Sequence, residues 1–345
     1  MQLKRFRRIE MRRTVTIATL AKELGLSESA VSKALNDYPD ISPATKELVR
    51  SKADELGYSP NLLARNLAKK TSNFVGIVIR DVSSIYGEMF KSLNAVARRN
   101  GLNLIMYDTN NSRTIERNCI QNLIDTMALG IVVVPVSEDV SRIQKMTQGR
   151  APVVYLGNKV RLDTVNYVCS DSTLGTQMAL RHVAEQGHKK IVMLCDHKSS
   201  DSRSRKISAY REMMRSLGQK PLILHSEATD GTMAEAGYVL GRRLLASGAD
   251  FTAVFAVKDT MAIGAMGAFR EAGIKVPEQI SVVGYDGIDA AALPVISLTT
   301  VAQPRMEMAE QIISILRRHA KDPSLQPEHY LAKPELIIRN STLVH

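Results

Sequence analysis

The stretch Val15-Thr-Ile-Ala-Thr-Leu-Ala-Lys-Glu-Leu-Gly-Leu-Ser-Glu-Ser-Ala-Val-Ser-Lys-Ala-Leu-Asn36 has the pattern of two short helices joined by a tight turn. Thr16 and Ser27 each precede apolar residues at helical spacing, so each can cap a helix with its side-chain oxygen. Gly25 lies between them and can end the first helix, because glycine adopts a left-handed conformation at little cost. The stretch therefore predicts a helix-turn-helix.

The second of these helices has two different sides. Val31 and Leu35 form the side expected to be buried. The other side carries short or basic hydrogen-bonding groups, namely Glu28, Ser29, Ser32, Lys33 and Asn36. A helix that reads base edges in the major groove of DNA needs such groups. The sequence therefore predicts DNA as a partner.

Two further helices are expected after this stretch. Ser42-Pro43 predicts the start of a third helix, which ends at Gly57. Its apolar side is expected to contain Leu48, Val49, Ala53 and Leu56. A short helix follows Pro60 over residues 61–68. So short a helix is unstable alone in water, so it must be ordered by DNA or by another protein surface.

Residues 15–68 closely resemble the DNA-binding headpiece of the lac/gal repressor family (LacI/GalR family) of bacterial transcription regulators. The matching segments are Val15-Thr-Ile, Gly25-Leu-Ser27, Val31-Ser-Lys-Ala-Leu-Asn36, Ile41-Ser42, Leu56-Gly-Tyr58 and Pro60-Asn61. Later segments support the match, namely Asp259-Thr-Met-Ala-Ile-Gly264, Ile280-Ser-Val-Val-Gly-Tyr-Asp286 and Leu298-Thr-Thr-Val301 with Gln303-Pro304. The resemblance implies a repressor of carbohydrate-related genes that binds a pseudo-palindromic operator as a homodimer, under the control of a small effector.

The resemblance also implies which residues contact DNA. Those at positions that contact phosphates or support the helices are Thr16, Ser27, Ser32, Asn36, Ser42 and Thr45; those at base-reading positions are Glu28, Ser29 and Lys33. Glu28 can accept a hydrogen bond from cytosine, and Lys33 can donate one to guanine. Alternatively, Glu28 only stabilises the N-terminus of its own helix. Asn61, Ala64 and Leu67 resemble a hinge helix that enters the minor groove, where Leu67 would part the central base step.

The basic residues are unevenly distributed. The formal net charge is +11, and residues 1–13 hold six basic side chains and one acidic side chain. Residues 14–73 hold eight basic and seven acidic side chains, so the headpiece is nearly neutral. The extension can add salt-sensitive phosphate contacts. The alternatives are a disordered tail without this role, or a natural start at Met11.

Several classes of protein are not favoured by the sequence. It has no apolar run long enough for a membrane span and no signal peptide, which opposes a transport receptor. Cys119, Cys169 and Cys195 lack metal-ligand spacing and are expected to be reduced thiols in a cytoplasmic protein. The phosphate-binding, dinucleotide and hydrolase motifs are absent, so we expect no enzyme, no cofactor and no metal.

From residue 74 onward, short apolar runs alternate with amphipathic helical segments, which predicts α/β architecture with two doubly wound parallel sheets and a cleft between them. The resemblance implies a periplasmic-binding-protein-like core whose chain crosses between halves near Ser170, Thr300 and residue 320. The expected domains are an extension (1–13), a headpiece (14–59), a hinge and linker (60–73) and a core (74–345). Within the core, the N-subdomain is 74–170 with 301–320, and the C-subdomain is 171–300 with 321–342.

Three residues at predicted strand ends are candidates for binding the effector. Asp286 ends the Gly-Tyr-Asp segment, where the family commonly binds sugar hydroxyls through a carboxylate. Tyr86 can cover a sugar ring, and Gln303 lies where the last crossover reaches the cleft. Alternatively, Asp286 caps the next segment and Tyr86 belongs to the core.

Departures from the family pattern bear on the effector's charge. Lys206 replaces a usual arginine, Lys258 a usual asparagine or small residue, and Gly157-Asn158 stands where many members have an aspartate. Arg203 and Arg205 can substitute for the missing arginine. These cations favour an anionic effector such as a sugar acid or sugar phosphate. The alternative is a neutral sugar, with Lys206 paired to Asp286 or Lys258 in solvent.

The end of the chain bears on its assembly. No heptad-bearing tail follows residue 342, so we expect a dimer rather than a tetramer.

Overall fold

A computed structural model describes residues 15–58, 72–82, 84–157, 160–196, 201–227 and 231–342. The chain divides into two compact units, residues 1–70 and 71–345, and each is described by itself. None of the described helices is both long and apolar enough to cross a membrane.

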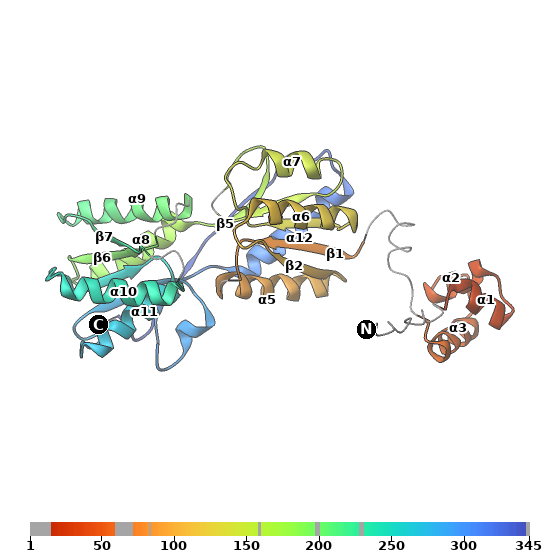
Figure 1. Ribbon diagram of the computed structural model, residues 1–345, viewed down its shortest axis with the longest axis horizontal. Helices are drawn as coiled ribbons and strands as arrows, with labels where there is room; N and C mark the ends of the chain where they lie inside the picture. The colour runs from red at the N-terminus through yellow and green to blue at the C-terminus, as the bar shows by residue number, and fades with distance from the viewer. Residues whose placement is uncertain are drawn as a thin grey trace, which may run out of the picture. The chain divides into compact units, whose positions relative to one another are not determined.

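The first unit contains three described helices, α1 (Ile17–Leu24), α2 (Glu28–Leu35) and α3 (Pro43–Leu56) (Figure 1). The predicted caps are present: Thr16, Ser27 and Ser42 each accept a hydrogen bond from the backbone N–H three residues on. Gly25 adopts φ +64° and ends α1. The basic extension and the hinge helix predicted over residues 61–68 lie outside the described residues.

The core of this unit differs from the prediction at two positions. In α2, Val31 and Ala34 are fully buried, whereas Leu35 is only partly buried. In α3, Val49 and Ala53 are buried, but Leu48 is 54% exposed. Three short helices enclose only a narrow apolar stripe, and a one-residue step around a helix turns a side chain about 100° away from it.

The first sheet of the second unit has the strand order β11-β5-β4-β3-β1-β2, with all neighbouring strands parallel. Its strands are β1 (Phe74–Ile79), β2 (Asn103–Asp108), β3 (Gly130–Val133), β4 (Val153–Leu156), β5 (Asn166–Ser170) and β11 (His329–Ala332). Its helices are α5 (Ser84–Arg99), α6 (Arg113–Asp125), α7 (Ser141–Thr147) and α12 (Arg305–Lys321). Side chains of α5 and α12 pack in one cluster and those of α6 and α7 in another, so both faces of the sheet are covered.

The second sheet has the order β12-β10-β9-β8-β6-β7, and only its edge pair β10–β12 is antiparallel. Its strands are β6 (Ile191–Cys195), β7 (Leu222–His225), β8 (Ala253–Ala256), β9 (Ser281–Asp286), β10 (Thr299–Ala302) and β12 (Glu335–Ile337). Its helices are α8 (Ser172–Glu185), α9 (Asp201–Ser216), α10 (Met233–Ala246) and α11 (Asp259–Glu271), with the 3-10 helix η1 (Asp289–Ala292). Figure 1 shows α8 and α9 on one side of these strands and α10 and α11 on the other.

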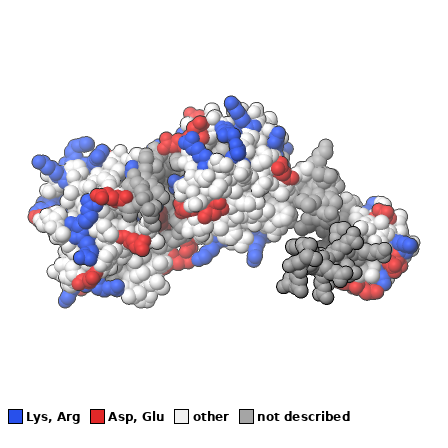
Figure 2. Space-filling model, in the orientation of Figure 1, with Lys and Arg blue, Asp and Glu red and all other residues white. Residues whose placement is uncertain are grey.

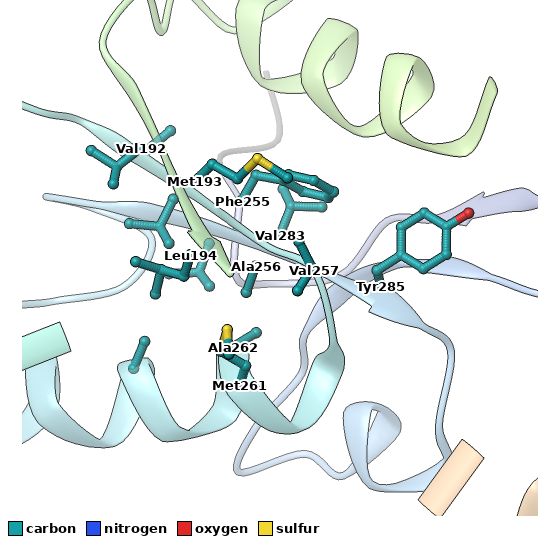
Figure 3. Close-up of a cluster of buried hydrophobic side chains, with 14 of the residues drawn as sticks. Val192, Met193, Leu194, Phe255, Ala256, Val257, Met261, Ala262, Val283 and Tyr285 are labelled. Atoms are coloured by element: carbon teal, nitrogen blue, oxygen red, sulfur yellow. The ribbon is translucent and has the colours of Figure 1, made fainter. Parts of the chain in front are cut away.

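The core of this second sheet is continuous. Phe255, Met261, Val283 and Tyr285 belong to one buried cluster, in which α11 packs against the strands (Figure 3). The strands carry apolar residues at successive positions, as strands covered on both faces require.

The chain passes between the two sheets after β5, after β10 and after β11. The predicted third crossing near residue 320 is wrong. Helix α12 continues to Lys321, and β11 then pairs in parallel with β5, so residues 321–332 complete the first subdomain. The crossing follows Ala332, immediately before β12.

Candidate functional site

Charged and polar side chains gather where the strands of the second sheet end. Asp196 directly follows β6, Lys258 directly precedes α11 after β8, Asp286 is the last residue of β9, and Gln303 follows β10. Because all four strands are parallel, their carboxyl ends share one edge of the sheet, where open α/β sheets bind ligands.

Asp286 has an unusual backbone and a buried carboxylate. Its φ is +121°, a conformation that residues with a side chain rarely adopt. Its Oδ1 accepts a hydrogen bond from Gln303 Nε2 at 3.0 Å. Burial raises the pKa of the Asp286 carboxyl, while the charges of Lys206 and Lys258 oppose the rise. The structure gives no sign of the capping alternative, since η1 has no side-chain cap.

Lys206 lies inside the protein on α9. Its Nζ donates to the backbone oxygen of Val257 at 2.9 Å and lies 3.3 Å from the centre of the Tyr285 ring. Burial lowers the pKa of Lys206 to about 8, with the nearby Asp286 acting in the opposite direction. Among the described ion pairs none joins Lys206 to Asp286, so the two charges act on each other at longer range.

Asp196 belongs to this group of charged side chains, although the sequence did not lead us to name it. Its carboxylate lies 3.8 Å from Arg203 Nη1 and 3.5 Å from Lys258 Nζ, and its side chain is only 10% exposed. Arg203 also donates to the backbone oxygen of Asp196 at 2.7 Å. Lys258 is therefore paired, rather than directed only into solvent.

Arg80 connects this cluster to the first subdomain. It follows β1, and its Nη2 donates to the hydroxyl of Tyr86 at 2.9 Å. Burial lowers the pKa of Arg80, but Tyr86, Asp81 and Asp196 together raise it above its ordinary value. Asp196 thus acts electrostatically on an arginine of the other sheet.

The remaining predicted residues lie at different depths. Tyr86 is partly buried against the core of the first sheet, in line with the core alternative, and its contact with a sugar ring stays a prediction. Arg203 and Lys206 are three residues apart and therefore share one side of α9. Arg205 is two residues from Arg203 and one from Lys206, so the helix directs it to a different side. Asn158 lies outside the described residues.

The position of Asp196 and Arg80 after parallel strands is a signal that sequence reasoning could have used. Both directly follow apolar runs of the sequence, which form β1 and β6 in the structure. Applying the strand-end rule to every such run, instead of only to family motifs, identifies both residues.

Asp259 holds the backbone next to Asp286 through buried hydrogen bonds. It is fully buried at the start of α11, where its Oδ2 accepts from Ile288 N at 2.9 Å and its Oδ1 accepts from the Thr300 hydroxyl. Burial raises the pKa of Asp259 to about 6. These bonds hold the backbone that follows Asp286.

The helix α2 exposes Glu28 and Ser29 in its first turn. Lys33 Nζ lies 2.5 Å from Asp40, and this partner raises the pKa of Lys33. Asn36 donates from Nδ2 to Ser32 O at 2.8 Å at the end of the helix.

The other predicted DNA contacts have these positions. Ser42 and Thr45 hydroxyls are 2.8 Å apart at the start of α3, and Thr16 caps α1. The hinge residues Asn61, Ala64 and Leu67 lie outside the described residues.

Comparison with known proteins defines the class. Residues 16–61 match the family described as bacterial regulatory proteins, lacI family, and residues 180–342 match a periplasmic binding protein-like domain. The chain is 31% identical over 308 residues to the HTH-type transcriptional regulator AscG of Escherichia coli K12, covering 87% of this chain and 90% of AscG. It is 30% identical over 335 residues to the regulator GalR of the same strain, covering 94% and 95%.

Solved structures share the fold. A lac repressor dimer bound to operator and the anti-inducer ONPF superposes with TM-score 0.85 at 23% identity, covering 96% of this chain and 100% of the repressor chain. A complex of the regulator CelR with cellobiose gives 0.69 at 24% identity, covering 95% and 99%.

The chain therefore belongs to the lacI family of bacterial regulatory proteins. It is a DNA-binding transcriptional regulator with a periplasmic binding protein-like domain, and the relatives named above are regulators rather than enzymes. This confirms the predicted family and fold class.

Proposed function

We propose that this protein is a cytoplasmic repressor of carbohydrate-related genes, and that an anionic sugar bound between the subdomains changes its operator affinity. The supporting observation is the charge at the strand ends. Four cations, Arg80, Arg203, Lys206 and Lys258, lie close to the carboxylates of Asp196 and Asp286. Asp81 acts on Arg80, and Asp259 is buried in hydrogen bonds to Thr300 and Ile288.

Each side of this arrangement fits one part of a sugar acid or sugar phosphate. The Asp286 carboxylate, oriented by Gln303, can accept hydrogen bonds from sugar hydroxyls. The Lys258 side chain is 36% exposed and its ammonium is 3.5 Å from Asp196, so an anion can compete for it. Lys206 supplies a second positive charge close by, acting as a point charge.

A ligand screen with matched neutral and charged sugars tests this proposal. Thermal unfolding is measured with glucose, gluconate and glucose 6-phosphate, and with galactose and galactonate. We expect the charged member of at least one set to raise the melting temperature and its neutral member to leave it unchanged. Stabilisation by neutral sugars alone would contradict an anionic effector.

The affinity for such an anion should fall at alkaline pH, because Lys206 loses its positive charge there. An anion favours protonated Lys206, whose pKa of about 8 means that half of it has lost its proton near pH 8 in the free protein. Affinity should therefore be flat from about pH 6 to 7 and fall up to about tenfold per pH unit above about 8, with proton uptake on binding. Calorimetry in buffers of different ionisation enthalpy measures both quantities.

Lys258→Met is the matched variant for this pH profile. It should weaken binding but keep the alkaline fall, whereas Lys206→Met should remove the proton uptake. An affinity that stays constant to about pH 9.5 would show that Lys206 does not contribute its charge.

On the DNA side, we propose that α2 reads the operator and that a homodimer, held by hinge helices, presents two copies of it to a two-fold symmetric site. An effector that prefers one relation between the subdomains would change the fraction of protein competent to bind. The exposed Glu28 and Ser29 and the adjacent Lys33 support this assignment.

Lys33→Ala should weaken binding to a selected operator about tenfold to a hundredfold and relax the preference at one base pair. Lys52→Ala on α3, whose ammonium pairs with Glu55, is the control and should have a smaller effect. Fluorescence anisotropy on operator and random duplexes measures the difference. An equal loss on both duplexes for Lys33→Ala would show a phosphate contact instead of base reading.

A further inference from the structure

The segment from Asp286 to Asp289 (the 286–289 segment) is held by helices of both subdomains. Arg305, the first residue of α12, donates from Nη1 to the backbone oxygen of Asp286 and from Nη2 to that of Gly287, both at 2.9 Å. On α5, Lys91 pairs with Asp289 at 3.0 Å. Since α5 and α12 pack together on the first sheet, both contacts tie that subdomain to the end of β9.

The second subdomain also holds this segment, through residues of α11 and β10. Asp259 accepts from Ile288 N, and Gly287 N donates to the Thr300 hydroxyl at 3.3 Å. A Cβ at Gly287 would lie 2.6 Å from Ala302 Cα, so the segment passes tightly against β10. Asp286, with φ +121°, is therefore fixed in a strained conformation by contacts on several sides.

The two contacts from the first subdomain differ in strength. The Lys91 and Asp289 side chains are 68% and 70% exposed, and exposed pairs of this kind contribute little. The Arg305 hydrogen bonds are part-buried and join a planar guanidinium to two successive carbonyls. A lysine has no such fork and cannot reproduce both bonds in this geometry.

We propose that Arg305 is the positioning residue that couples Asp286 to α12, so that a change at the Asp286 backbone is passed to the first subdomain. The role of Asp286 in binding effector belongs to the proposed function, and this inference rests on it for its biological meaning. Arg305 itself acts through the two backbone oxygens.

The coupling can be tested without any ligand, using the full chain and two spin labels. Cys119, Cys169 and Cys195 are buried, so cysteines introduced as Lys145→Cys on α7 and Arg211→Cys on α9 are the reactive ones. Pulsed electron–electron double resonance then measures the distance distribution between the two labels, one on each subdomain.

We expect Arg305→Met to shift or broaden this distribution, and Arg305→Lys to restore it only in part. Arg317→Met, on the same helix but bonded to Asn100 within the first subdomain, is the matched control and should leave it unchanged. Circular dichroism shows whether each variant is folded. Should Arg305→Met unfold, the Arg305→Lys distribution decides the question.

A distribution identical in wild type, Arg305→Met and Arg305→Lys would overturn the proposal. A second arm adds gluconate at a concentration that saturates each variant, with glucose as the neutral control. A shift in wild type that is reduced in Arg305→Lys and lost in Arg305→Met supports coupling. If no sugar acid binds, only the proposed anionic effector fails, because the ligand-free arm does not depend on it.

Discussion

Asp286→Asn is expected to weaken binding of the sugar acid found by the screen about a hundredfold or more and to leave operator affinity unchanged. Hydrogen bonds to a charged acceptor contribute roughly 1.5–3 kcal/mol each, and the carboxylate can accept two from adjacent hydroxyls. Asparagine keeps one acceptor oxygen and a similar shape, so the variant removes the charge and one acceptor. Isothermal titration measures the loss.

The matched control is Asp289→Asn, three residues further on, whose carboxylate is exposed and paired with Lys91. It should bind the sugar acid like the wild type. With Asp286→Asn, operator affinity should keep its effector-free value at effector concentrations that change the operator affinity of the wild type. An unchanged effector affinity for Asp286→Asn would remove this carboxylate from the binding site.

Gly264→Ala is expected to destabilise the second subdomain by about 3 kcal/mol or more, because overpacking against backbone cannot be relieved by a side-chain rotation. Helices α10 and α11 meet here through their backbones. A Cβ at Gly264 would lie 1.9 Å from Ala234 O, and a Cβ at Gly237 would lie 2.1 Å from Met261 O. Urea denaturation followed by circular dichroism measures the loss.

Gly267→Ala lies in the same helix and serves as the control. The nearest atom to its added Cβ is Tyr238 Cδ2 at 3.9 Å, which is ordinary contact. Alanine favours helix over glycine by up to about 1 kcal/mol, so this variant should be as stable as the wild type or more stable. Equal stability of the two variants would contradict the close packing of α10 and α11.

Elements specified by local rules were predictable from the sequence. Thr16, Ser27 and Gly25 fix the ends of the first helices through caps and a left-handed residue, and the structure has these caps. The apolar runs that became β1, β6 and β8 are buried on both faces, so their composition alone indicates parallel strands.

Elements specified by distant partners were not predictable in the same way. In β11, His329 and Leu331 are exposed and only Ala332 is fully buried, so the segment lacks the apolar run that would predict a strand. Its position is set by pairing with β5, far away in sequence. That is why the third crossing was expected too early.

The same distinction between local patterns and distant partners applies to the candidate site. Asp286 and Gln303 were named from motifs, and the structure brings them into hydrogen-bond contact. The partners of the lysines depend on tertiary packing: Lys258 meets Asp196, and Lys206 meets a carbonyl and the ring of Tyr285. No spacing in the sequence encodes these pairs.

Surface charge adds a constraint on where DNA binds. Over the face of residues 71–345 visible in Figure 2, basic and acidic side chains are interspersed. That face therefore presents no broad basic surface for DNA, which is consistent with operator recognition by the headpiece.

We propose that α2 reads an operator and that an anionic sugar controls this reading. Selection of genomic fragments by the purified full-length protein, with and without the sugar acid, tests it directly. We predict enrichment of one two-fold symmetric sequence, with an affinity that the sugar acid changes and its neutral counterpart does not. No enriched sequence, or an affinity that no sugar acid alters, would contradict the account.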